Sequence, residues 1–202
     1  MVRLLKVKVG MSPEIERAFL ACPRELFVPE HLKERAYEDV PLPIGYGQTI
    51  SQPSTVAIMT RLLDPKPGNR VLEVGTGSGW QAAILSKLVH PGTVYTVERI
   101  PELAEFARRN LKAAGAENVR VFVGDGSGGL PEHAPYDRII VTAASPEIPE
   151  PLLNQLAPGG RMVLPVGREV QKMTVVEKTA EGLKIEEAGE FVFVPLIGAH
   201  GF

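Results

Sequence analysis

The residues best suited to chemistry lie in one glycine-rich segment, residues 71–80, with the sequence VLEVGTGSGW. Its apolar, β-branched start is typical of a strand that is buried on both faces. Gly75, Gly77 and Gly79 follow at once, and a helical pattern begins near Trp80. Glycines in such a turn let a ligand approach the backbone, and the amides at the start of the helix face that ligand. The segment therefore predicts a site for a cofactor that carries a nucleoside.

The spacing of the glycines narrows the class of cofactor. A dinucleotide fingerprint, G-x-G-x-x-G, would need a small residue where this chain has Trp80. A phosphate-binding loop would need Gly-Lys-Ser/Thr at its end, and no such element follows. Glu73, two residues before Gly75, would repel a pyrophosphate but suits a cofactor with positive charge. S-adenosyl-L-methionine has an ammonium and a sulfonium and no phosphate, so we favour it over a nicotinamide cofactor.

Acidic residues also follow the next two predicted strands. The strand over 93–98 ends at Glu98, which is placed to accept hydrogen bonds from two ribose hydroxyls. The strand over 119–123 runs into Gly-Asp-Gly, in which Asp125 can accept a hydrogen bond from an adenine amino group. Either acid alone is more often an ordinary exposed loop residue. Three such features at successive strand ends favour one cofactor site, because ligands of open parallel sheets bind there.

Composition limits the remaining possibilities. A chain of 202 residues with 44% hydrophobic residues is long enough for one domain with a sizeable core. The net charge of -2 gives no general attraction to nucleic acid or to an anionic membrane. The single cysteine, Cys22, fits a reducing compartment, and the four histidines show no metal-ligand spacing. We expect a cytoplasmic monomer that does not span a membrane and holds no metal.

Apolar periodicity and punctuation residues predict the order of the elements. Helices are expected over 13–21, capped by Ser12, and over 53–63. Frequent prolines over 22–51 argue against one long helix or a central strand there. Strands and helices alternate after residue 68, and short antiparallel strands are expected over three C-terminal ranges, 173–177, 183–186 and 190–194.

The predicted fold is therefore α/β, with a doubly wound sheet, a parallel core, an antiparallel C-terminal edge and an N-terminal lid of helices and loops. We assign residues 1–202 to one domain. Within it, 1–67 form the lid and substrate-loop region, 68–167 form the cofactor-binding core, and 168–202 form the antiparallel strands.

Several segments occur in an order that resembles one enzyme family, the protein-L-isoaspartate O-methyltransferases. They are GQTISQP at 47–53, LEVGTGSG at 72–79, GDG at 124–126, APYD at 134–137 and LAPGGR at 156–161. The T-I-S-x-P element is the specific part, and the resemblance covers nearly the whole chain. It implies a Rossmann-like class I methyltransferase that uses S-adenosyl-L-methionine and releases S-adenosyl-L-homocysteine. The implied acceptor is the free α-carboxylate of an L-isoaspartyl residue in a damaged protein or peptide.

The resemblance also implies roles for individual residues. Ser51 matches the active-site serine and Thr49 its neighbour in the loop, while Gln48, Ile50 and Ser54 are expected to contact the substrate. Many relatives have a histidine where this chain has Ser54. The residues expected to bind the cofactor are Glu73, Gly75, Thr76, Gly77, Ser78, Glu98, Gly124, Asp125 and Gly126. No general base is required, because a carboxylate with a pKa of about 3.5 is already ionised at neutral pH.

Other interpretations stay open on the residues alone. Ser51 could simply cap the helix that begins at Pro53, a contribution of about 1 kcal/mol to stability. The enzyme could be a class I methyltransferase for another small molecule or for a nucleic acid. It could also be a module that binds S-adenosyl-L-methionine without turnover, although intact Thr49 and Ser51 argue against this.

Overall fold

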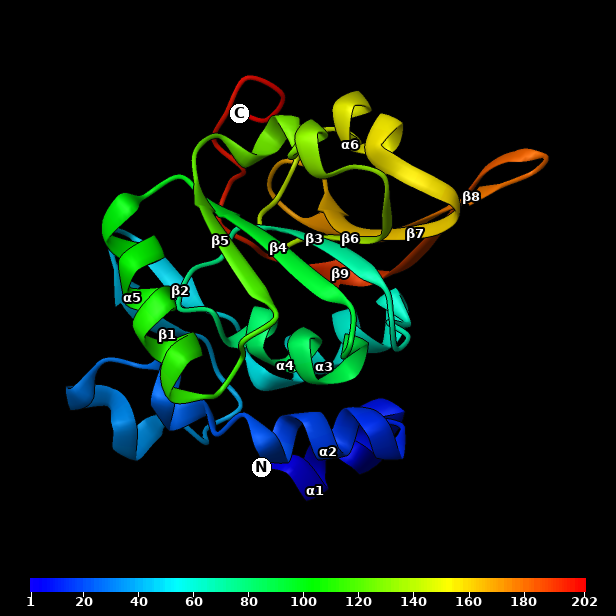
Figure 1. Cartoon of the computed structure of the whole chain (residues 1–202). Coiled ribbons are helices and arrows are strands. Elements are labelled where there is room, and N and C mark those ends of the chain that lie inside the picture. Colours follow the sequence, from blue (N-terminus) through cyan, green and yellow to red (C-terminus); the bar gives the residue numbers. More distant parts are fainter.

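The computed structural model describes residues 1–202 and is built around a seven-stranded sheet (Figure 1). Its strands are β3 (Arg70–Val74), β4 (Thr93–Glu98), β5 (Val119–Val123), β6 (Tyr136–Val141), β7 (Leu156–Val166), β8 (Gln171–Thr179) and β9 (Gly182–Phe191). They lie in the order β5-β4-β3-β6-β7-β8-β9. The pairs from β5 to β7 are parallel, whereas β7, β8 and β9 pair antiparallel. The predicted parallel core with an antiparallel C-terminal edge is confirmed.

Helices cover both faces of this sheet, but unequally. One face packs against α3 (Pro53–Leu63), α4 (Trp80–Val89) and α5 (Pro101–Ala113), and its apolar cluster holds 34 buried residues. The opposite face has a cluster of 14, covered by α6 (Glu150–Gln155), two short 3-10 helices and the C-terminal tail. Burial of apolar surface is the main stabilising term in folding, so the larger cluster contributes most of it. No helix combines the length and apolar character needed to cross a bilayer.

The N-terminal residues form an outer layer over the helices α3, α4 and α5. After α1 (Val2–Leu5) and a π-helical turn at Lys6–Gly10, α2 (Pro13–Ala21) packs against α4, on the side of α4 away from the sheet (Figure 1). Short 3-10 helices at Arg24–Phe27 and Glu30–Arg35 then connect α2 to the next strand along the chain. The predicted helix over 13–21 and its cap are confirmed, since the amide of Ile15 donates to Ser12 Oγ at 3.3 Å.

A hairpin follows that the sequence analysis did not predict. Strands β1 (Leu42–Gly45) and β2 (Gln48–Ile50) pair antiparallel in a separate two-stranded sheet. Gly45 at the end of β1 and the two turn residues Tyr46 and Gly47 all take positive φ, with +55° at Tyr46. Such angles are uncommon for a residue with a Cβ, so the turn gives only a partial signal in the sequence. The hairpin agrees with the prediction that no central strand forms over 22–51.

Two predicted strands near the C-terminus are one strand in the structure. The ranges 183–186 and 190–194 were expected to be separate, but β9 runs from Gly182 to Phe191 without a break. Gly189, which lies between the two expected ranges, has φ +93° and occurs where the register with β8 shifts. A β-bulge absorbs an extra residue while pairing continues, which explains why the glycine does not end the strand.

The Ser12 cap provides a direct test of the N-terminal layer. Replacing Ser12 by Ala should lower the free energy of unfolding by about 1 kcal/mol, because the Ile15 amide loses its acceptor. Chemical denaturation monitored by circular dichroism would measure the change. Ser12→Asp, which keeps an acceptor, should retain the stability, and an equal loss in both variants would contradict the capping role.

Candidate active site

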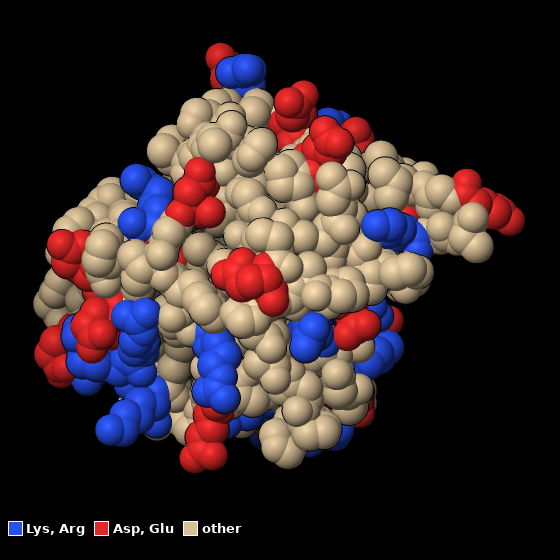
Figure 2. Space-filling model, turned by 45° about the horizontal axis from the view of Figure 1, so that its top comes forward, with Lys and Arg blue, Asp and Glu red and all other residues tan.

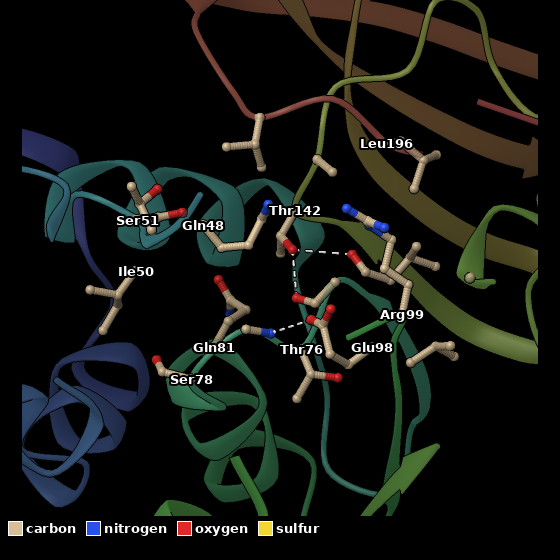
Figure 3. A pocket seen from close by; sticks show the side chains of 18 of the residues that line it. Gln48, Ile50, Ser51, Thr76, Ser78, Gln81, Glu98, Arg99, Thr142 and Leu196 are labelled. Atoms are coloured by element: carbon tan, nitrogen blue, oxygen red, sulfur yellow. Dashed lines mark hydrogen bonds between the residues drawn. The ribbon is translucent and has the colours of Figure 1, made fainter. Parts of the chain in front are cut away.

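A cavity lies at the carboxyl edge of the parallel strands, with about 880 Å³ of empty space that includes the open solvent at its mouth (Figure 3). Its walls come from the ends of β3, β4 and β6, from β2, from the start of α4 and from the C-terminal tail. This is the edge where open α/β sheets bind their ligands. The predicted site residues that border it are Gln48, Thr49, Ile50, Ser51, Gly75, Thr76, Gly77, Ser78, Glu98 and Gly126.

The turn after β3 is held by the strands on both sides of it. The amides of Gly75 and Thr76 both donate to the Val97 carbonyl, at 2.9 and 3.2 Å. Directly after β6, Thr142 Oγ1 donates to the Gly75 carbonyl at 2.7 Å, as a dashed line in Figure 3 shows. Gly75 has φ +96°, and a Cβ there would lie 2.4 Å from Thr142 Oγ1. Only glycine therefore fits this position without displacing its neighbours.

Glu98, at the end of β4, braces the same turn and borders the cavity. Its Oε2 accepts from the Gly77 amide at 2.9 Å and its Oε1 from the Ile100 amide at 3.0 Å. The residue is 6% exposed, so its carboxylate is nearly buried beside the glycines. A carboxylate offers about four lone-pair sites, so two backbone bonds leave acceptor capacity for a ligand. The structure thus places an acceptor at the strand end where ribose hydroxyls were expected.

Glu73 lies in the core and does not border the cavity. Side chains alternate between the two faces along a strand. Glu73 therefore lies on the same face as Val71, the face that α3, α4 and α5 cover. It is fully buried, with Oε2 accepting from Thr96 Oγ1 at 2.5 Å and Oε1 without any partner. Burial, reinforced by the nearby Glu98 charge, raises its pKa to about 8, although the Thr96 hydrogen bond opposes the shift. Thr96 in turn contacts the Thr76 hydroxyl at 2.7 Å, which links Glu73 to the cavity wall.

Asp125 also points away from the cavity, toward the C-terminal tail. Its Oδ2 accepts from the Ala199 amide at 2.8 Å, and its Oδ1 accepts from the amide and hydroxyl of Ser127. Burial opposes ionisation of Asp125, but these hydrogen bonds outweigh it and lower the pKa of the carboxyl. Of its two neighbours, Gly126 borders the cavity and Gly124 does not.

The opposite wall comes from β2 and the residue after it. Ser51, Gln48 and Ile50 lie across the cavity from Glu98 and Arg99 (Figure 3). The segment reaches this position because the antiparallel β1–β2 hairpin reverses the direction of the chain just before α3 begins. The structure therefore brings the TIS element and the glycine turn to two sides of one cavity.

Ser51 does not cap the following helix, so that interpretation is wrong. The N-cap of α3 is Gln52, which makes no capping bond through its side chain. The amide of Ser54 donates instead to Asp39 Oδ1 at 2.8 Å. Burial opposes the charge of Asp39, but hydrogen bonds from Lys8 and Ser54 lower the pKa of its carboxyl. Ser54 is 4% exposed and lies outside the cavity lining.

Several residues that border the cavity were missed by the sequence analysis. Thr142 directly follows β6, so the strand-end rule that pointed to Glu98 would have found it as well. The tail residues of 194–197 border the cavity because the strand-end residue Ala144 pairs with them, a contact between distant segments with no local signal. No three His, Cys, Asp or Glu side chains lie together so that they could hold a metal ion.

The buried Glu73 carboxyl predicts a specific dependence of stability on pH. A carboxyl whose pKa is raised on folding binds its proton more tightly in the native state, so its contribution is present below about pH 4.5 and is lost as the pH rises through about 8. Glu73→Gln should remove this loss, which has a slope of at most about 1.4 kcal/mol per pH unit. Unfolding free energies of the two proteins between pH 5 and 8 would measure it. Parallel pH profiles would contradict the assignment.

Comparison of this sequence with known proteins gives relatives that are methyltransferases, as the site residues indicate. A sequence model of the family described as protein-L-isoaspartate(D-aspartate) O-methyltransferase matches residues 1–201. Proteins named protein-L-isoaspartate O-methyltransferase are 57% identical in Hyperthermus butylicus and 59% identical in Methanopyrus kandleri. The alignments cover 99% of this chain in both cases, and 88% and 90% of those proteins.

Solved structures give the same result. A protein-L-isoaspartate O-methyltransferase is 37% identical with a TM-score of 0.90, covering 99% of this chain and 66% of that chain. A Plasmodium falciparum structure in complex with S-adenosyl-L-homocysteine, described as a β-aspartate methyltransferase, is 25% identical with a TM-score of 0.86. It covers 97% of this chain and 96% of that one. On the family match and these identities, the chain belongs to the protein-L-isoaspartate(D-aspartate) O-methyltransferase family.

Proposed function

We propose that this chain transfers the methyl group of S-adenosyl-L-methionine to the free α-carboxylate of L-isoaspartyl residues in damaged proteins and peptides, which initiates their repair. The observation that carries this proposal is the placement of the TIS element, residues 49–51, opposite the glycine turn across one cavity. Membership of the chain in this methyltransferase family supports the choice of acceptor.

The residues on the sheet side of the cavity fit S-adenosyl-L-methionine. Glu98 offers free acceptor capacity for ribose hydroxyls, and the backbone of 75–78 is open to the cavity. We assign Gly75, Thr76, Gly77 and Ser78 to the methionine part and Gly126 to the adenine edge.

Two of the residues expected to touch the cofactor receive indirect roles. Glu73 supports Thr76 through the Thr96 hydroxyl, because the three groups form one hydrogen-bonded chain. Asp125 fixes the tail beside Gly126, since its carboxylate already binds the amides of Ser127 and Ala199.

The proposed reaction mainly requires the protein to hold the methyl donor and the acceptor carboxylate in the correct relative position. When bound, S-adenosyl-L-methionine would supply an electrophilic methyl group on its sulfonium. The bond between an acceptor carboxylate oxygen and the methyl carbon would form in line as the carbon–sulfur bond breaks, giving a methyl ester and the neutral thioether of S-adenosyl-L-homocysteine. Ser51 and Thr49 would donate hydrogen bonds that orient the carboxylate, while Gln48 and Ile50 contact the peptide around it. Ile50 and Leu196 line the cavity with apolar surface, which would limit the water around the reacting atoms once both reactants are bound. Such orientation of two reactants can supply several kcal/mol of the barrier reduction, on the order of 7–11 in the best cases.

The charges on the surface favour a protein or peptide over a nucleic acid. On the face shown in Figure 2, Lys and Arg side chains are interspersed with Asp and Glu, and much of the surface carries neither. The chain as a whole has a net charge of -2, whereas nucleic-acid binding relies on many basic contacts to phosphates. We further propose a cytoplasmic location, which the single buried cysteine, Cys22, supports because it leaves no internal disulfide to form. We also propose that the protein is a monomer.

The first experiment uses two synthetic peptides that differ only in one linkage, isoaspartyl or normal aspartyl, with labelled S-adenosyl-L-methionine. Base-labile label in the isoaspartyl peptide alone is expected, because a methyl ester hydrolyses readily in base. Cofactor binding without label in either peptide would keep the cofactor and overturn the acceptor. That result would favour a methyltransferase for another substrate or a binding module without turnover.

The two walls of the cavity should respond differently to mutation. Ser51→Ala should lower kcat/KM for the isoaspartyl peptide by about 10-fold or more, the effect of losing a hydrogen bond to a charged group. Its affinity for S-adenosyl-L-methionine and its melting temperature should not change, because Ser51 makes no cap.

Glu98→Ala should do the reverse and weaken S-adenosyl-L-methionine binding first, by about 10-fold or more. Calorimetric titration of the cofactor beside steady-state kinetics with the peptide separates the two effects, and each variant serves as control for the other. A loss of melting temperature without any kinetic change in Ser51→Ala would sink its role at the acceptor.

A further inference from the structure

Arg24 carries a positive charge in the core without a carboxylate partner. It is 0% exposed, and none of the ion pairs of the chain includes it. Its two terminal nitrogens donate only to backbone carbonyls, which belong to Ala36 (2.9 Å), Glu38 (3.3 Å), Val40 (3.0 Å), Ile50 (3.4 Å) and Ser51 (3.0 Å). One side chain thus joins the loop after the second 3-10 helix to the TIS element.

The same guanidinium contacts the other wall of the cavity through an aromatic ring. Its central carbon lies 5.3 Å from the centroid of the Trp80 ring, a cation–π distance. Trp80 borders the cavity and is the first residue of α4, directly after the glycine turn. Its indole nitrogen donates to the Cys22 carbonyl at 2.9 Å, which fixes the ring. Arg24 therefore lies between the backbone of Ser51 and the helix that begins at the cofactor turn.

Arginine suits this position for chemical reasons. The two terminal nitrogens of its planar guanidinium match carbonyls spread over two directions, whereas a lysine offers three donors from one point; only the Nε–H of Arg24 lacks a partner. Burial lowers the pKa of Arg24 to about 10, with Asp39 and Glu38 acting in the opposite direction, so the group keeps its charge at neutral pH.

We propose that Arg24 is the positioning residue of the acceptor wall. By holding the carbonyls of Ile50 and Ser51 against Trp80, it sets the separation between the acceptor carboxylate and the methyl donor. The inference rests on the proposed acceptor role of residues 48–51. We call the contacts of Arg24 with the carbonyls of Ile50 and Ser51 and with the Trp80 ring the clamp. Displacing two reactants by about 1 Å can slow a reaction by about 100-fold, so loosening the clamp should lower the rate of methyl transfer.

Arg24→Lys tests the clamp while keeping the charge. We expect kcat/KM for the isoaspartyl peptide to fall at least 10-fold, with the dissociation constant of S-adenosyl-L-methionine unchanged within twofold. Arg24→Gln is the second variant, because it leaves no unpaired charge in the core and should fold if the lysine variant does not. The same split between peptide and cofactor is expected for it.

Arg138→Lys is the matched control. Arg138 is partly buried and also donates to carbonyls, those of Asp64 at 3.0 Å and Asp137 at 2.8 Å. It does not border the cavity, so its variant should lose some melting temperature while kcat/KM stays within twofold of the wild type. This separates a general loss of stability from a loss of positioning.

The outcomes distinguish the clamp from the function on which it rests. An active wild type with unimpaired Arg24 variants would overturn the clamp and leave the proposed function intact. Equal losses of peptide turnover and cofactor affinity would also overturn it, because they indicate a purely structural role. A wild type that labels neither peptide would overturn the proposed function and the acceptor role of the clamped segment with it.

Discussion

The placement of the site depends on one constraint, the fixing of the turn after β3 by the strands on either side of it. The Val97 carbonyl of β4 accepts two amides of this turn, and Thr142 after β6 bonds its first carbonyl. Both braces exist because the chain passes from β3 to β4 and β5 in one direction and then crosses to β6 on the other side. The turn thus lies at the point where strand order reverses, which leaves a crevice at the carboxyl edge. Cavity, glycine requirement and the position of Glu98 all follow from that topology.

The cofactor side of the cavity could be predicted from the sequence because its signals are local. A buried strand, a glycine turn and an acid at the next strand end each occupy a few successive residues, and the structure has them where the pattern indicated. Glu73 shows the limit of this reasoning. Its place two residues before Gly75 suggested a contact with the cofactor. Because side chains alternate between the faces along β3, however, its side chain lies on the face that α3, α4 and α5 cover. The same two-residue period that makes the strand recognisable decides this orientation.

The remaining parts could not be predicted because they depend on contacts between distant segments. Asp125 binds the amide of Ala199, 74 residues away, and nothing near either residue signals the pairing. The β1–β2 hairpin depends on a left-handed Tyr46, which propensity disfavours. Arg24 is a further case, since a fully buried arginine looks in the sequence like any exposed one. Asp125 and Arg24 depend on contacts between distant segments, and the hairpin depends on a local backbone conformation that residue type does not indicate.

The two walls are stabilised in different ways, and this matters for the proposed reaction. The cofactor wall is part of the central sheet, whereas residues 48–51 belong to a small separate sheet that side chains must hold in place. The acceptor segment itself, Gln-Thr-Ile-Ser, presents no charged side chain to the cavity. Transfer of a methyl group from a sulfonium to a carboxylate removes one positive and one negative charge, so surroundings of low polarity favour it over the separated ions. A fixed cation beside the acceptor would stabilise the carboxylate before transfer more than the neutral ester after it, and so would oppose the reaction. A neutral acceptor wall, positioned through its backbone by a buried cation that does not border the cavity, reduces that loss.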